Sequence, residues 1–169
     1  MLEINRKKRI TEALADIEAA ASLSDYEAVD VLWVALLKMA NTMPGSNEHK
    51  RMMNLVQAIP DDQIKTCLVS RGVQRLLDLD PPLETVLTDP HERLDPEATA
   101  SAVRAIRACH ETNPRDAILS LGEILKRIRN KRVHGFKTRN GSRDAEILEA
   151  ARAILEDLCR ASAEALSGG

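Results

Sequence analysis

The sequence predicts an all-α protein, and two features of its composition support this prediction. Ala, Leu, Arg and Glu are the four most frequent residue types among the 169 residues, and all four favour helices. Only three residues are aromatic, which is fewer than a β-sandwich or a β-barrel normally uses. A chain of this length can bury a substantial core. We therefore expect a single domain over residues 1–169, built as an up-and-down bundle of six to seven helices.

Four helices are expected in residues 1–80. Apolar side chains at helical spacing indicate the first over residues 3–21, and Ser24 is expected to cap a second that runs to about Asn41. The second helix is apolar nearly all round, which predicts a central position in the bundle.

The third and fourth helices follow a turn rich in Pro, Gly and Ser. Ser46 is expected to cap the third helix, and Pro60 ends it. The fourth is expected from Asp61 to about Leu79, with a possible break at Gly72.

A proline-rich loop over residues 81–95 separates these helices from a second group over residues 96–165. Four prolines lie between positions 81 and 96, and each removes a backbone donor and restricts the residue before it. We interpret the loop as a link between two halves of one fold, because each half is small for an independent core.

Three helices are expected in the second group, the first over residues 96–110. Asn113 followed by Pro114 marks the start of the next, which ends near Val133. The last covers about residues 143–165. The middle helix carries an apolar stripe that faces the core: Ile118, Leu121, Leu125 and Ile128.

The three cysteines are odd in number, widely spaced and without a C-x-x-C motif, so we expect free thiols. The N-terminus lacks the apolar segment of a signal peptide, and no stretch is apolar enough to span a membrane. These features predict a soluble, cytoplasmic protein without a membrane partner. Nothing in the sequence indicates a cofactor or a metal site.

The distribution of charge indicates a partner that carries many negative charges. Residues 126–143 contain eight cations and no carboxylate. Because the net charge of the whole chain is −2, the remaining residues carry a net charge of −10. Such asymmetry is typical of a site that binds a polyanion, although a few cations also suit a helix C-terminus. The eight cations are Lys126, Arg127, Arg129, Lys131, Arg132, Lys137, Arg139 and Arg143.

Three residues in this segment combine into a candidate catalytic group. Arg129 offers a planar fork of donors for phosphate, and His134 can exchange a proton near neutral pH. Asn130 shares a helix face with His134, four residues further on. Arg and His without a nearby carboxylate suit phosphodiester chemistry without a metal ion, because metal-dependent nucleases need carboxylates to hold the ion.

The stretch "RNKRVH" matches the R-N-x-x-x-H pattern of HEPN domains (higher eukaryotes and prokaryotes nucleotide-binding), and the sequence around it resembles the same family. Over residues 117–160 a helix reads L-x-x-I-R-N, followed by H-G, a short basic loop, R-D and a closing amphipathic helix. The family spacing also admits Arg127 as the arginine, but Arg129 is preferred because Asn130 follows it.

This resemblance implies a helical bundle that forms a homodimer and pairs two such motifs in one cleft. Active members are metal-independent endoribonucleases. His134 would be the general base or acid at the RNA 2′-hydroxyl, Arg129 would stabilise charge on the phosphate, and Asn130 would position the site. Flanking phosphates would be held by Lys131, Arg132, Lys137 and Arg139.

Two functions from different classes remain open. The first is a ribonuclease that acts as a toxin or antiviral effector under the control of an inhibitory protein. The second is a non-catalytic HEPN module for dimerisation and for binding nucleic acid, a nucleotide or a protein. One departure is clear: Phe136 stands where HEPN toxins paired with nucleotidyltransferases carry a tyrosine that is modified, so this modification is not expected.

Overall fold

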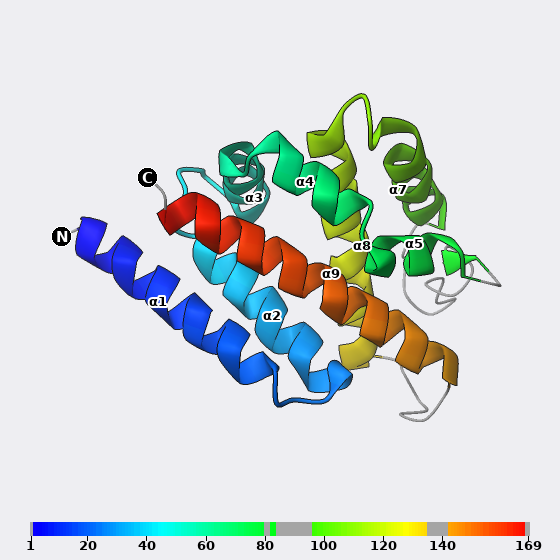
Figure 1. The fold of residues 1–169 in the computed structure, drawn as a ribbon, viewed down its shortest axis with the longest axis horizontal. Helices are drawn as coiled ribbons and strands as arrows, with labels where there is room; N and C mark the ends of the chain where they lie inside the picture. Colours follow the sequence, from blue (N-terminus) through cyan, green and yellow to red (C-terminus); the bar gives the residue numbers. More distant parts are fainter. Residues whose placement is uncertain (1, 80–81, 84–95, 135–141, 168–169) are drawn as a thin grey trace.

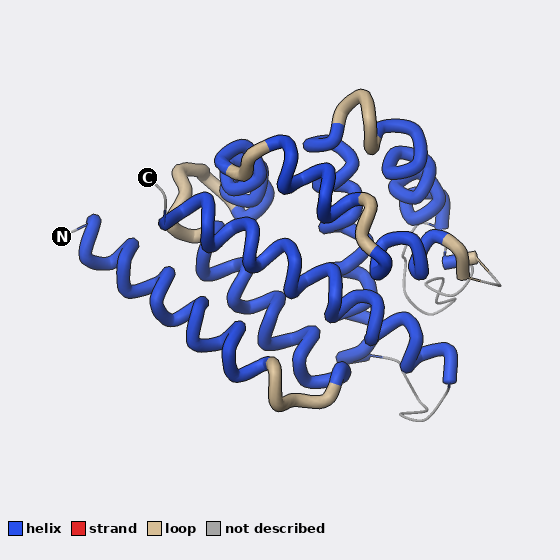
Figure 2. The backbone as a smooth tube through the Cα atoms, in the orientation of Figure 1, coloured by secondary structure: helices blue, strands red, loops and turns tan. Residues whose placement is uncertain are grey.

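The computed structural model is all-helical, as the sequence predicts (Figures 1 and 2). It describes residues 2–79, 82–83, 96–134 and 142–167, and no strand occurs in these ranges. The described residues form eight helices. None of the described helices combines the length and the apolar character that crossing a membrane requires.

Three long helices form one layer: α1 (Leu2–Ala20), α2 (Asp25–Ala40) and α9 (Ser142–Ser167). Figure 1 shows them side by side, with α2 between α1 and α9. Half of the residues of α2 are buried, which confirms the central position expected from its apolar sequence.

A second group of helices packs against α9 and against α8 (Pro114–His134), which passes behind α9 in Figure 1. The helix α7 (Pro96–Cys109) lies along α8, while α3 (Glu48–Ala58) and α4 (Asp61–Leu68) cover its other side. The short helix α5 (Arg71–Leu77) rests on the N-terminal half of α9.

The residues that begin the helices agree with prediction in part. Ser24 caps α2 in a reciprocal box, in which its hydroxyl accepts from the Glu27 amide and Glu27 accepts from the Ser24 amide. The cap of α3 is Asn47 rather than Ser46, because the Asn47 side chain reaches the Lys50 amide at 2.9 Å.

The helix expected from Asp61 to Leu79 is two helices, and this raises the number above the six to seven expected. The break lies at Val69–Ser70 rather than at Gly72. The hydroxyl of Ser70 accepts from the Val73 amide and starts α5, so a serine cap decides the boundary. Gly72 lies inside α5.

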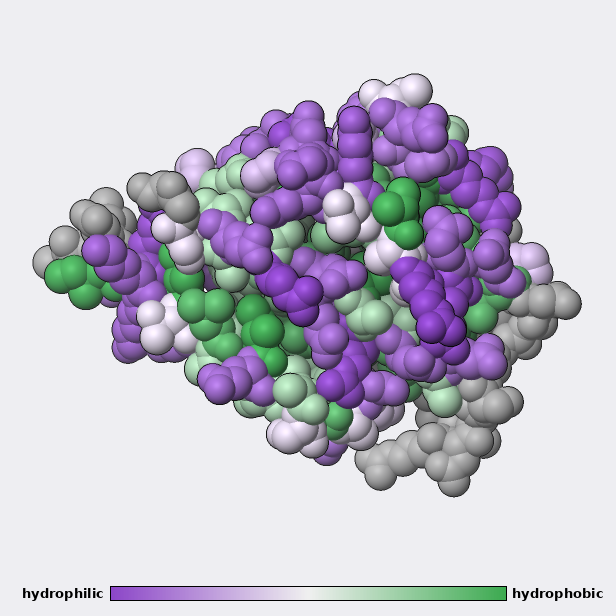
Figure 3. All heavy atoms as spheres, in the orientation of Figure 1, coloured by the Kyte–Doolittle hydropathy of each residue, from purple (hydrophilic) through white to green (hydrophobic). Residues whose placement is uncertain are grey.

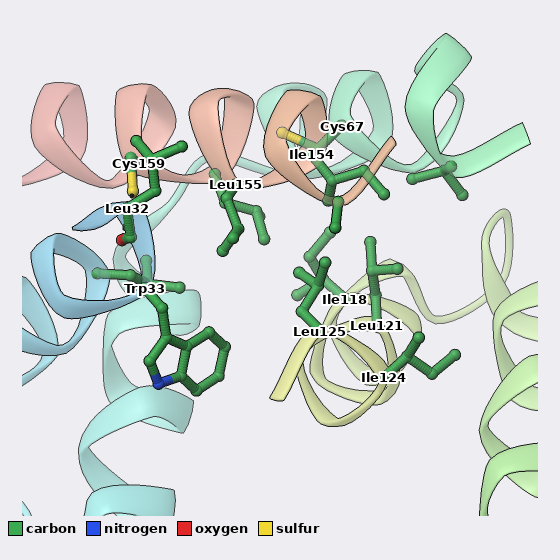
Figure 4. Packing of buried hydrophobic residues seen from close by; sticks show 14 of the residues in the cluster. Leu32, Trp33, Cys67, Ile118, Leu121, Ile124, Leu125, Ile154, Leu155 and Cys159 are labelled. Carbon is green, nitrogen blue, oxygen red and sulfur yellow. Dashed lines mark hydrogen bonds between the residues drawn. The ribbon is translucent and has the colours of Figure 1, made fainter. Parts of the chain in front are cut away.

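The buried apolar side chains form one continuous cluster that draws on every described helix. Figure 4 shows part of this cluster, in which Leu155 points from α9 toward α8 and Leu32 of α2 lies beside Cys159 of α9. The apolar stripe expected on α8 is fully buried, and Trp33 is a core residue with only 4% of its surface exposed.

The helix α1 is held partly by one arginine. Arg152 of α9 donates to the carbonyls of Ala20, Ala21 and Leu23, and it pairs with Asp25. These carbonyls lie at the last residue of α1 and in the turn that follows it, where the regular ladder of helix hydrogen bonds has ended. A strip of apolar surface remains visible between α1 and α9 in Figure 3, where Leu14 lines a shallow groove.

Candidate functional site

The residues predicted to form the site lie at the C-terminal end of α8. This helix continues to His134, one residue beyond the predicted end, so the backbone of the whole R-N-x-x-x-H pattern is helical. The side chains of Arg129 and Asn130 are described, and both are half-buried. The side chains of Lys131, Arg132 and His134 lie outside the described part, and so do Lys137 and Arg139 entirely.

Arg129 is anchored to the central helix α2. Its Nε donates to Oδ1 of Asp30 at 3.0 Å, and about a third of each side chain stays exposed. Among the described residues, the Nη groups of Arg129 have no acceptor, and these groups are the ones that bind phosphate in a forked geometry. The ion pair therefore orients the guanidinium and leaves part of its donor set open.

The other described cations of the segment are bonded to different helices. Lys126 pairs with Glu48 of α3 at 3.1 Å, and Arg127 donates to the buried hydroxyl of Thr99 on α7. Together with Arg129, three of the eight cations contact three neighbouring helices. The segment is therefore not one uniform cationic surface, because part of its charge holds α8 in place.

The geometry of a regular helix separates the two main candidates. Residues 129 and 134 are five positions apart, which turns them about 140° around the α8 axis. Arg129 lies on the side that faces α2. One copy of the chain therefore does not present positions 129 and 134 on the same side of α8. Asn130 and position 134, four residues apart, do share a side.

Asp30 is the member of this site that the sequence analysis missed. A signal was present, because a carboxylate inside the apolar run "AVDVLWVALL" needs a partner wherever the helix is central. The sequence could not identify that partner, which lies 99 residues further along the chain.

The cysteines are unpaired, as predicted. Burial raises the pKa of the Cys67 thiol to about 11, with a smaller contribution from the nearby Asp157 carboxylate. Burial also raises the pKa of Cys159, whose Sγ donates to the Leu32 carbonyl. Both thiols therefore stay protonated at neutral pH and are poor nucleophiles.

The described residues include no group of three His, Cys, Asp or Glu side chains close enough together to hold a metal ion.

No protein-family model matches the chain, and neither a curated protein nor a solved structure is significantly similar to it. The resemblance to HEPN domains therefore rests on the sequence pattern of residues 117–160.

Proposed function

We propose that the C-terminal end of α8 is the active site of a metal-independent endoribonuclease of the HEPN type. The ion pair between Arg129 and Asp30 is the observation that supports this best. A guanidinium that is already anchored loses little side-chain freedom when it binds phosphate, and its free edge matches two phosphate oxygens. Asn130 follows directly on α8 and is half-buried, so part of its side chain is open to a substrate.

In this reaction His134 takes the proton from the RNA 2′-hydroxyl, and the 2′-oxygen attacks the adjacent phosphorus. The bond to the 5′-oxygen breaks, this oxygen takes up a proton from solvent water, and His134 then returns its proton to the solvent. The products are a 2′,3′-cyclic phosphate and a 5′-hydroxyl. Arg129 stabilises the negative charge that builds up on the phosphate, and Asn130 positions the reacting groups. Lys131, Arg132, Lys137 and Arg139 bind the flanking phosphates.

The separation of positions 129 and 134 around α8 favours a composite site in a homodimer. Arg129 of one copy and His134 of the partner subunit would then act on one phosphate. We further propose that the RNA is cytoplasmic and that the chain acts as a toxin or antiviral effector held inactive by a protein partner. Growth arrest on expression, relieved by His134→Ala, would support this role.

The test is RNA cleavage by the purified protein in EDTA, with wild type beside His134→Ala and Arg129→Ala. Arg104→Ala is a matched control, because Arg104 is an exposed arginine on α7 whose described partner is Glu97. Loss of cleavage in both α8 variants, with cyclic phosphate ends in wild type and control, is the expected result. Cleavage that survives both substitutions would exclude this site.

A mixing experiment tests the composite site. Neither Arg129→Ala nor His134→Ala is expected to cleave RNA alone, but a mixed dimer contains one site with both residues intact. Mixing the two variants should therefore restore part of the activity. Activity that is absent in each variant and stays absent after mixing would mean that each site uses residues of a single copy.

The Arg129–Asp30 pair also favours the second function, a non-catalytic HEPN module. In this second function the ion pair, whose two side chains are each about a third exposed, has a structural role alone and fixes α8 against α2. In that case no RNA would be cleaved in EDTA, and RNA binding would fall steeply with salt. Arg129→Ala would then lower the melting temperature, and neither this variant nor the wild type would cleave RNA.

A further inference from the structure

A second candidate site lies on the opposite side of α8 from α7. A cavity of about 290 Å³ opens between α2, α3, α8 and α9. Its walls are mostly apolar and include Trp33, Leu36, Leu55, Ile118 and Leu158. In Figure 4 the indole of Trp33 extends from α2 toward the space between α3 and α8. The volume is close to the lower end of the range for small-molecule pockets, roughly 300–1,000 Å³.

One buried polar group in this cavity has no partner. Ser162 of α9 lines the cavity and is fully buried, and its Oγ makes no hydrogen bond in the structure. A serine inside a helix can bond to the carbonyl of the preceding turn, but Ser162 does not. A buried hydroxyl without a partner costs free energy, which a bound molecule with a donor or acceptor would recover.

The side of the cavity formed by α8 is unfilled next to Gly122. A Cβ added at Gly122 would meet no atom within 4 Å outside its own helix, so the cavity reaches the α8 backbone. The polar residues lie elsewhere on the lining and include the ion pair of Glu48 with Lys126 and the exposed His49. The cavity therefore combines apolar walls, one deep hydroxyl and charged side chains that are partly exposed.

We propose that this cavity binds a small, largely apolar molecule that carries one neutral hydroxyl or carbonyl group, which hydrogen-bonds to Ser162. Water fits the cavity less well, because a buried water needs two to four polar partners, and the buried side chains of the described lining offer only the Ser162 hydroxyl and the Trp33 indole N–H. A charged ligand group beside Ser162 would lie against apolar walls, because the charged lining residues Glu48 and Lys126 are partly exposed and pair with each other. This site is independent of the proposed RNA site.

The chain carries its own reporter for this site. Trp33 is the only tryptophan and lines the cavity, so its fluorescence reports on an occupant. We suggest titrating the full chain with 1-octanol below its solubility limit and recording the melting temperature in parallel. A saturable change in fluorescence and a higher melting temperature are expected, because a ligand that binds only the folded state stabilises it.

Two substitutions locate the binding. Gly122→Leu places a side chain in the open space and should weaken 1-octanol binding at least tenfold, whereas Gly122→Ala adds only a Cβ and should keep it. Ser162→Ala removes the hydroxyl and should weaken 1-octanol binding by roughly 2- to 10-fold, the range for one hydrogen bond. Ser162→Ala should also raise the melting temperature of the unliganded protein, because it removes a buried hydroxyl without a partner.

Other outcomes would overturn the proposal. A wild-type response that does not saturate, or equal binding by Gly122→Leu, would mean that 1-octanol does not occupy this cavity. A Ser162→Ala protein that binds 1-octanol as well as wild type would remove Ser162 as the recognition group. If Gly122→Leu does not fold, Ser162→Ala and the wild-type titration still decide.

Discussion

The two halves of α9 contact their neighbours in opposite ways. In the N-terminal half, Gly72 of α5 lies so close that a Cβ on it would meet the Ala150 carbonyl and the Ile154 side chain, both at 3.0 Å. In the C-terminal half, Leu158 and Ser162 face a cavity of about 290 Å³, and Gly122 across it borders open space.

Glycine therefore has two different roles in this one core. Gly72 allows two helices to approach closely, and any larger residue would push them apart. Gly122 leaves a volume unfilled, which a well-packed core normally avoids because voids lose dispersion contacts. The difference indicates that the closed half stabilises the fold, while the open half is available for a ligand.

The largest effect is expected from removing the arginine of the closed half. Arg152→Ala should lower the free energy of unfolding by about 2–3 kcal/mol, because it removes charge-assisted bonds to three carbonyls and to Asp25. Urea denaturation measures this change. Arg160→Ala is the control, since Arg160 is a more exposed arginine of the same helix, and it should change stability by less than about 0.5 kcal/mol. Equal effects would show that Arg152 does not hold α1.

Gly72→Ala should destabilise the protein by about 1–3 kcal/mol, despite the better helix propensity of alanine. The cause is the added Cβ, which has no room against Ala150 and Ile154. Chemical denaturation of the variant beside wild type gives the value. A variant as stable as wild type would mean that α5 shifts away from α9 at no cost, and the contrast between the two halves would fail.

Stability should fall in alkaline solution because of Cys67, which lies near Asp157 and Arg160 in the open half of α9. Its pKa is raised to about 11 from 9.0, so the unfolded chain loses this proton first. The protonated Cys67 thiol therefore contributes fully to the free energy of unfolding below pH 9, and this contribution is lost as the pH rises toward 11. The free energy of unfolding should fall by about 1 kcal/mol between pH 9 and 10. Denaturation at both pH values should show this loss in wild type and a smaller one in Cys67→Ala.

The smallest effect in this comparison is expected at Gly122, and it is a stabilising one. Gly122→Ala should raise the free energy of unfolding by about 0.5–1 kcal/mol, because alanine favours the helix and its Cβ has free space. Thermal and urea unfolding against wild type would detect it. Destabilisation at Gly122 similar to that at Gly72 would show that the cavity is not open to α8.

Much of the fold follows from local sequence. Helix propensity and apolar spacing predicted the all-α class, the central α2 and the buried stripe of α8, and short-range signals located Ser24 and Pro114. These features depend on residues within a few turns of one another, which is why they can be predicted. The break at Ser70 was missed because a serine cap competed with a continuous helical pattern.

The candidate site also has features that local sequence predicts and features that only the tertiary structure decides. The pattern of Arg129, Asn130 and His134 comes from sequence alone, and it carries the resemblance to HEPN domains. The tertiary structure decided that Arg129 pairs with Asp30 and that Lys126 and Arg127 brace α8 against α3 and α7. It also decided that Ser162 and Gly122 border one cavity. These contacts join residues far apart in the chain, so only the packing of whole helices brings them together.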